Sequence, residues 1–212
     1  MRNIKTALRY KFNSWRDEIW NHKYLILLSM LFLLLANISY WVTSMYVDKK
    51  ASAQVTDLIL DHIPAMNLTP IFTTGFSLTV IVLFLYPFLF KVRHIHVVIS
   101  QLSLLVFIRS IFITLTHMRA PADAILSQLP RLYDFLVFNN DLFFSGHAAV
   151  PFLGFLLFRK EWIGKYFLIV SIILSATVLL MHVHYSIDVF AAFFITYGSY
   201  KIGNILFKKL NK

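Results

Sequence analysis

The sequence predicts an all-α membrane protein, a six-transmembrane-helix bundle preceded by an N-terminal amphipathic interfacial helix. Of the 212 residues, 58% are hydrophobic and only 14% are charged, and the mean hydropathy is +0.69. A soluble domain carries about 25% charged residues, and a disordered chain has low hydrophobicity. A span needs about 20 apolar residues, so this length accommodates about six spans and no second soluble domain.

Residues 1–23 predict the interfacial helix. Apolar residues recur there at spacings of three and four, and Lys and Arg side chains occupy the other side. A basic amphipathic helix of this kind is typical of a segment that lies on the inner membrane surface and contacts anionic lipid. The expected organisation is therefore a cytoplasmic amphipathic segment, 1–23, followed by a six-span membrane domain, 24–212.

Six apolar segments predict the spans, and residues that favour turns separate them. The third segment is interrupted by Arg109, and the sixth carries Asp188 in its first turn. The spans are expected over Tyr24–Tyr46, Leu68–Phe90, Val97–Thr116, Phe143–Phe158, Tyr166–Val183 and Tyr185–Phe207.

The distribution of basic residues predicts the orientation. Fifteen of the 20 Lys and Arg residues fall on the side that holds both termini, and only four fall on the other side. Because cytoplasmic loops carry an excess of Lys and Arg, both termini are expected in the cytoplasm. The net charge of +10 then indicates anionic lipid at the cytoplasmic face rather than nucleic acid as the partner. Short loops favour a bacterial plasma membrane, with a eukaryotic secretory membrane and a lumenal site as the alternative.

Three ionisable residues, His147, His184 and Asp188, are expected at the outer ends of spans. Ionisable groups at membrane depth are costly and are candidates for function. The spacing of four would place His184 and Asp188 on one helical face, where the carboxylate fixes the imidazole tautomer and leaves the other nitrogen as a nucleophile. The fourth and sixth spans run in the same direction, so two helix N-termini would offer N–H groups to an anion such as phosphate.

Two sequence motifs contain these residues. Asp141-Leu-Phe-Phe-Ser145-Gly146-His147 and His184-Tyr185-Ser-Ile-Asp188-Val resemble the signature motifs of sphingomyelin-synthase-like proteins, a branch of the type 2 phosphatidic acid phosphatase superfamily. The resemblance implies an extracytoplasmic site and a two-step phosphoryl transfer without metal or cofactor. It implies that His184 becomes a phosphohistidine, that Asp188 orients it, and that His147 acts first as acid and then as base.

Departures from the phosphatase branch favour one reaction class. Phe112 and Val178 stand where that branch has cationic residues. The absence of these two cations favours a singly charged phosphodiester as the substrate over a phosphomonoester dianion. The expected function is therefore a lipid phosphotransferase or phosphodiesterase that takes headgroups from a membrane phospholipid donor to a lipid or water acceptor. A lipid phosphatase is the alternative enzyme, and a proton-coupled transporter is the non-enzyme alternative.

Further residues are expected to bind the substrate. Arg109 could equally form a structural ion pair with Asp57, Asp61 or Asp141 instead of binding substrate. Tyr185 could equally belong to the interfacial aromatic belt. Cysteine is absent, which excludes disulfides and thiolate chemistry, and no metal site is expected. The expected substrate-binding residues are Ser145, Gly146, Arg109, Asp141, Tyr185, His117 and Arg119.

Overall fold

A computed structural model describes residues 2–51, 53–126, 138 and 140–207, with side chains from residue 13 onward. These residues form six α-helices and two short 3-10 helices, Leu60–His62 and Val92–His94. Within them no strand occurs beyond one isolated bridge. The helices are α1 (Arg2–Lys50), α2 (Thr69–Phe90), α3 (Ile95–Leu115), α4 (Gly146–Phe158), α5 (Trp162–Leu180) and α6 (Ser186–Leu206).

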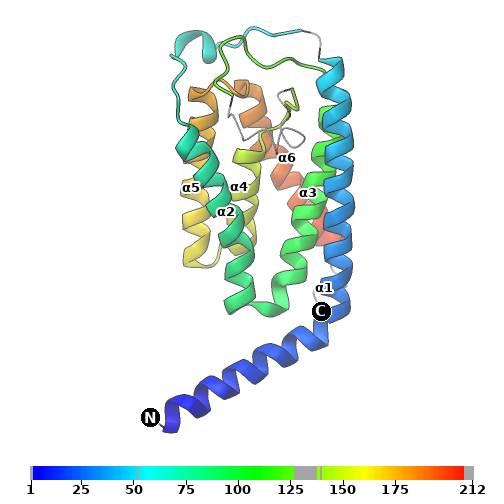
Figure 1. Cartoon of the computed structure of the whole chain (residues 1–212), viewed down its shortest axis with the longest axis vertical. Coiled ribbons are helices and arrows are strands. Elements are labelled where there is room, and N and C mark those ends of the chain that lie inside the picture. Colours follow the sequence, from blue (N-terminus) through cyan, green and yellow to red (C-terminus); the bar gives the residue numbers. More distant parts are fainter. Residues whose placement is uncertain (1, 52, 127–137, 139, 208–212) are drawn as a thin grey trace.

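Successive helices run between two ends of one bundle (Figure 1). The beginning of α1 and the end of α6 lie at one end, together with the α2–α3 and α4–α5 connections. The α1–α2, α3–α4 and α5–α6 connections lie at the other end, and the two candidate histidine motifs belong to these connections. The arrangement therefore gathers the predicted site at the end opposite the termini.

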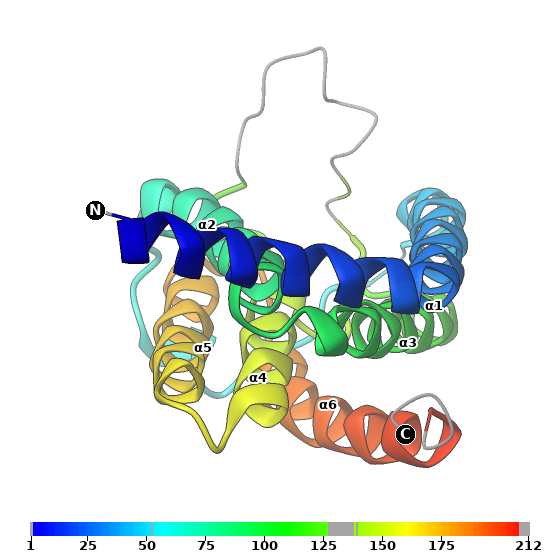
Figure 2. The same ribbon diagram turned by 90° about the horizontal axis from the view of Figure 1, so that it is seen from below.

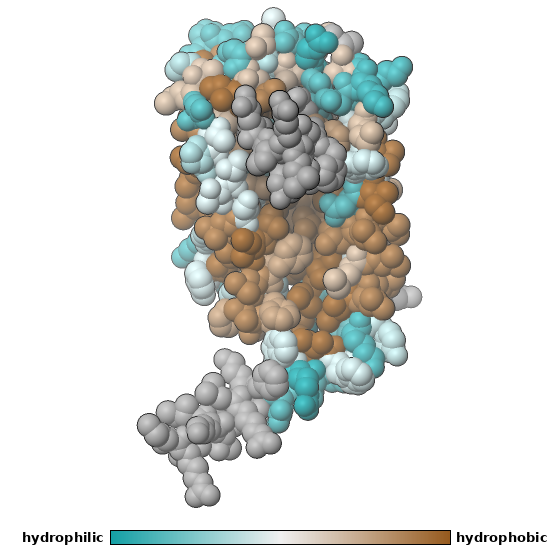
Figure 3. Space-filling view, in the orientation of Figure 1, coloured by the Kyte–Doolittle hydropathy of each residue, from teal (hydrophilic) through white to brown (hydrophobic). Residues whose placement is uncertain are grey.

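Four described helical segments are long and apolar enough to cross a membrane: Asn13–Lys50, Thr69–Phe90, Val92–Leu115 and Trp162–Leu180. Figure 3 shows a broad apolar band around the middle of the bundle, with hydrophilic residues towards its ends. These features indicate an integral membrane protein. The 13 residues of α4 reach only about 20 Å, which is shorter than a hydrocarbon core. α6 has the length of a span but is not among the four, so the exact six-span bundle stays a prediction.

α1 is one continuous helix, where the sequence predicts a surface segment and a separate span. Its N-terminal part turns away from the bundle axis and crosses beneath the other helices (Figures 1 and 2). Trp15 donates a hydrogen bond to the Phe88 carbonyl at 2.7 Å, and Glu18 pairs with Arg93 at 2.5 Å. The side chains of residues 2–12 lie outside the described set, so the amphipathic face predicted there stays a prediction.

α4 lies at the centre of the bundle and contacts α2, α3, α5 and α6. Its approach to α5 depends on Gly154, where a Cβ atom would lie 2.6 Å from Cδ1 of Phe167. The Ser171 hydroxyl donates to the Ala148 carbonyl at 3.0 Å across the same interface. α1, in contrast, packs along α3 at the edge of the bundle (Figure 2). The central position of α4 fixes His147 relative to its neighbours.

Candidate active site

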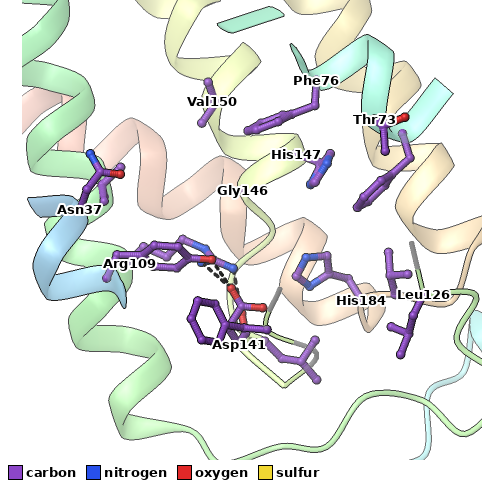
Figure 4. A pocket seen from close by; sticks show the side chains of 16 residues that line it. Asn37, Thr73, Phe76, Arg109, Leu126, Asp141, Gly146, His147, Val150 and His184 are labelled. Carbon is purple, nitrogen blue, oxygen red and sulfur yellow. Dashed lines mark hydrogen bonds and ion pairs between the residues drawn. The ribbon is translucent and has the colours of Figure 1, made fainter. Parts of the chain in front are cut away.

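A cavity of about 440 Å³ opens near the end of the bundle that is opposite the termini. Its walls come from α1, α2, α3 and α4, from the segment before α4 and from the turn before α6 (Figure 4). The volume falls within the range of small-molecule sites, and most of the lining side chains are apolar. Two histidines, His147 and His184, line this cavity together.

His184 and Asp188 form the predicted pair. Nδ1 of His184 lies 3.2 Å from Oδ2 of Asp188, and the same oxygen accepts the Tyr185 N–H at 3.0 Å. Asp188 is completely buried, and His184 is 7% exposed. α6 begins at Ser186, so the pairing arises in the turn before the helix and not on one helical face. Because a carboxylate only accepts, this pairing requires a proton on Nδ1, and in the neutral imidazole Nε2 then carries the lone pair.

His147 is the second residue of α4, and two aromatic residues of α2 hold its ring. The imidazole stacks on Phe72 with centroids 3.9 Å apart and lies 4.3 Å from the centroid of Phe76. Figure 4 shows His147 and His184 facing the same cavity from α4 and from the turn before α6. These two contacts with α2 therefore set the orientation of the His147 ring.

The N-terminus of α4 carries uncommitted backbone donors. Among the described residues, no acceptor pairs with the N–H groups of Gly146, His147 and Ala148. Gly146 lines the cavity, and a Cβ atom there would lie 3.9 Å from Nε of Arg109. The Ser145 N–H donates to the Asp188 carbonyl at 3.1 Å and holds the start of α4 against the start of α6. Free N–H groups at a helix N-terminus favour a bound anion.

The start of α6 is different, because carboxylates of the protein already occupy it. Oδ2 of Asp57 accepts the Ser186 N–H at 2.6 Å, and Oδ1 accepts the N–H groups of Ile59 and Leu60. Burial raises the pKa of Asp57, but these backbone hydrogen bonds outweigh it and the net pKa is lowered. The expectation of two converging anion-binding helix starts is therefore corrected: α4 offers the free donors, and Asp57 caps α6.

Arg109 clamps the segment that leads into α4. Nε donates to the Phe144 carbonyl at 3.0 Å, Nη2 donates to the Asp141 carbonyl at 2.8 Å, and Nη1 pairs with Oδ2 of Asp141 at 3.1 Å. The guanidinium also lies over the Tyr40 ring, and the Tyr40 hydroxyl donates to Asp141. Of the alternatives for Arg109, the structure has the pair with Asp141. Both residues line the cavity, so Arg109 retains access to a ligand.

Four expected substrate-binding residues do not line the cavity. Ser145 is completely buried, and its hydroxyl has no partner in the described part of the chain. The Tyr185 hydroxyl donates to the Arg119 carbonyl at 2.9 Å and accepts the Val55 N–H at 3.2 Å, so it joins two connections. His117 lies against the Tyr46 ring.

The Arg119 side chain is exposed outside the cavity. The cavity therefore brings together His147, His184, Gly146, Arg109 and Asp141, with Asp188 behind His184, whereas Ser145, Tyr185, His117 and Arg119 lie outside its lining. The catalytic and binding roles of all these residues stay predictions.

Sequence reasoning missed the contributions of α1 and α2 to the cavity. Asn37 and Tyr40 come from α1, and Phe72, Thr73 and Phe76 come from α2. One local signal was available, because Asn37 is the one amide side chain between Tyr24 and Tyr46 and a spacing of three puts it on the same helical face as Tyr40.

The comparison with protein families agrees with this geometry. The family described as PAP2 superfamily C-terminal matches residues 140–205, a range that contains His147, His184 and Asp188. The match supports a place in the type 2 phosphatidic acid phosphatase superfamily, whose members are generally phosphatases or phosphotransferases. No curated protein and no solved structure matches the chain. The chain is therefore similar to lipid phosphatases and phosphotransferases over the part that holds the histidine pair.

Proposed function

We propose that this protein is a sphingomyelin-synthase-like lipid phosphotransferase or phosphodiesterase that acts on phospholipid headgroups through a phosphohistidine at His184. The observation that carries the proposal is one apolar cavity lined by His147, His184 and Gly146, the first residue of α4, whose N–H is free. A nucleophile, a proton-transferring group and an anion cradle in a cavity of this kind are the components of covalent phosphoryl transfer.

The first step cleaves the donor lipid. Nε2 of His184 attacks phosphorus, and the bond between phosphorus and the diacylglycerol oxygen breaks. Protonated His147 gives its proton to that oxygen, so diacylglycerol leaves and the headgroup phosphate remains on Nε2. The imidazole then carries positive charge, which Asp188 stabilises through Nδ1. The free N–H groups of α4 stabilise the charge that develops on the phosphoryl oxygens.

The second step transfers the group and restores the protein. His147, now neutral, takes the proton from the hydroxyl of the acceptor, whose oxygen attacks phosphorus. The Nε2–phosphorus bond breaks, so His184 regains its lone pair and His147 is again protonated. With a lipid alcohol as acceptor the product is a new phosphorylated lipid, and with water it is the free headgroup phosphate.

The charge around the cavity supports a phosphodiester substrate. Arg109 is the one Lys or Arg among the described lining residues, and three of its donors already serve Asp141 and Phe144. A phosphomonoester dianion calls for more positive charge than this cavity supplies, because its second negative charge also loses its water. A singly charged phosphodiester suits the remaining donors of Arg109 and the start of α4.

Product analysis of the purified protein tests this function. The protein is given vesicles of a mixed phospholipid panel, phosphatidic acid and ceramide, and the products are identified by mass spectrometry. We expect diacylglycerol together with a new phosphorylated lipid or a free headgroup phosphate, and the same turnover in a strong chelator. His184→Ala should lose at least a thousandfold of this turnover, since the nucleophile is removed. His62→Ala, an exposed histidine at the same end, is the matched control and should match the wild type.

Undiminished turnover in His184→Ala would contradict the phosphohistidine mechanism. Loss of activity in the chelator would contradict metal independence. Inorganic phosphate from phosphatidic acid would identify the second candidate, a lipid phosphatase, which the family match also accommodates. A proton-coupled transporter remains the non-enzyme alternative, and it predicts no lipid turnover at all.

We propose the same orientation that the basic residues predict. Both termini face the cytoplasm and the cavity opens on the extracytoplasmic side of a bacterial plasma membrane, with a eukaryotic secretory membrane as the alternative. The position of the cavity at the end opposite the termini supports this arrangement.

A further inference from the structure

α1 forms one side of the cavity, although it lies outside the region that resembles the family. Figure 4 shows Asn37 and Arg109 on one side of the cavity and His184 and Leu126 on the other. The site therefore has a second polar region, contributed by α1, that the two-step mechanism does not use.

Asn37 is the uncommitted polar group of this region. The Tyr40 hydroxyl donates to Asp141, and Arg109 also pairs with Asp141. Asn37 uses one N–H of its amide, which donates to the Leu33 carbonyl at 2.8 Å. A carboxamide has two N–H donors and an oxygen acceptor, so one N–H and the oxygen remain. A free donor beside a free acceptor complements a hydroxyl or an amide, each of which can donate and accept.

The depth of Asn37 indicates a neutral ligand. α1 ends at Lys50, so Asn37 lies about 20 Å along the helix from that end. Leu34, Leu35 and Ile38 beside it are exposed apolar side chains, as expected for a helix that faces lipid. A charged headgroup at this depth would be costly, whereas a neutral polar group held by an amide is tolerated. Asn37 is itself exposed, so its second N–H and its oxygen are open to a ligand in the cavity that it lines.

We propose that Asn37 is a specificity-determining residue that binds a second hydroxyl or amide on the acceptor lipid, beyond the hydroxyl that reacts. The inference rests on the proposed transferase function and names the acceptor class: a neutral lipid with at least two adjacent polar groups. The charged donor phosphate lies between His184, the start of α4 and Arg109, so Asn37 on α1 is left for the neutral acceptor.

Acceptor kinetics test this proposal. The wild type, Asn37→Leu and the matched control Thr43→Val are assayed in vesicles of the phospholipid that the wild type cleaves. Thr43 also lies on α1 and bonds the Ser39 and Tyr40 carbonyls, but it does not line the cavity. Two acceptors of equal chain length are compared, a fatty alcohol with one hydroxyl and an N-acyl amino alcohol. Donor cleavage without acceptor is measured separately.

We expect the wild type to prefer the N-acyl amino alcohol. Asn37→Leu should reduce that preference about three- to tenfold through a higher acceptor KM, since one neutral hydrogen bond is lost. Donor cleavage and the fatty-alcohol reaction should stay within about twofold, and Thr43→Val should match the wild type.

Three results would overturn the proposal. An equal loss for both acceptors, or a parallel loss of donor cleavage, would mean that Asn37 contacts the donor or supports the fold. A wild type that passes the phosphoryl group only to water, with turnover still dependent on His184, would remove the acceptor proposal and leave the histidine chemistry in place. Turnover that does not depend on His184 would overturn the proposed function itself.

Discussion

At the scale of single residues, three carboxylates each hold a neighbouring group of this site in place. Asp188 orients His184, Asp141 fixes Arg109, and Asp57 caps the first turn of α6. A buried charge is costly unless hydrogen bonds compensate it, and each of these carboxylates accepts at least two. His184, Arg109 and the start of α6 are therefore each held by a carboxylate that other hydrogen bonds also fix.

Asp57 should make the stability of the protein depend on pH in the acid range. Its hydrogen bonds lower its pKa in the folded state below the ordinary value of 3.8. The stabilisation is therefore complete above that value and is lost as the pH falls through the folded-state pKa. Asp57→Asn should lower stability by about 2 kcal/mol at pH 7, because hydrogen bonds to a charged group are weakened. Thermal unfolding of both proteins in detergent, from pH 7 to pH 3, measures this.

The difference between the two melting temperatures should shrink as the pH falls below 3.8. Asp61→Asn, which changes an exposed carboxylate in the 3-10 helix that follows Asp57, should show no difference from the wild type. A difference for Asp57→Asn that stays constant over the whole range would show that the carboxylate charge has no part in capping α6.

At the scale of helices, α4 determines the geometry of the site, because α2, α3, α5 and α6 all pack around it. It is short, it begins at the cavity, and its close approach to α5 leaves no space for a side chain at Gly154. Movement of α4 would displace His147 and the free N–H groups together. Close packing of this helix and the geometry of the site are therefore coupled.

Two glycine substitutions should differ sharply for this reason. Gly154→Ala places a Cβ atom 2.6 Å from the Phe167 ring, and overpacking of this kind costs about 1–3 kcal/mol. Gly198→Ala in α6 meets nothing within 4 Å, so it should leave stability unchanged or raise it by up to about 1 kcal/mol through helix propensity. Melting temperatures of the two variants measure the contrast. Equal destabilisation by both would contradict the proposed role of Gly154.

The limits of α2 and α3 follow closely from the sequence, because an apolar run of span length specifies a helix by itself. The predicted span Leu68–Phe90 corresponds to the helix Thr69–Phe90, and the predicted span Val97–Thr116 corresponds to the helix Ile95–Leu115. α1 differs because residues 2–50 contain neither Gly nor Pro, so nothing separates the surface segment from the span. A change from polar to apolar composition does not by itself end a helix.

The site was predictable where its residues are neighbours in the sequence. His184 and Asp188 are four residues apart, and their pairing was expected, although a turn and not a helical face creates it. The role of Asp57 at Ser186 and the place of Asn37 in the cavity depend on packing between distant segments. Local spacing carries no information on such contacts, so the sequence alone did not indicate them.

At the scale of the whole molecule, the bundle separates a basic end with the termini from the end that holds the cavity. For the proposed function, this separation would place the reaction at one side of the membrane. Under the proposed function, the donor phosphate enters the cavity from one membrane surface only, while the apolar parts of both lipids remain in the bilayer. The proposed orientation would then set the compartment in which the proposed headgroup transfer takes place.

Cysteine labelling tests that orientation without background, because the chain contains no cysteine. Asp61 and Lys160 are exposed residues in connections at opposite ends of the bundle. In intact cells, a membrane-impermeant maleimide should label Asp61→Cys and should label Lys160→Cys only after the membrane is permeabilised. The reverse pattern would place the cavity in the cytoplasm and contradict the orientation proposed from the basic residues.

The most direct measurement of the central claim is the location of the covalent intermediate. The purified protein is incubated with the phospholipid it cleaves, quenched in alkali because a phosphohistidine is labile in acid, and analysed by peptide mass spectrometry. We expect a peptide that contains His184 to carry the added mass of the headgroup phosphate, and we expect no such adduct in His184→Ala. A headgroup phosphate on another residue, or full turnover in His184→Ala, would contradict it.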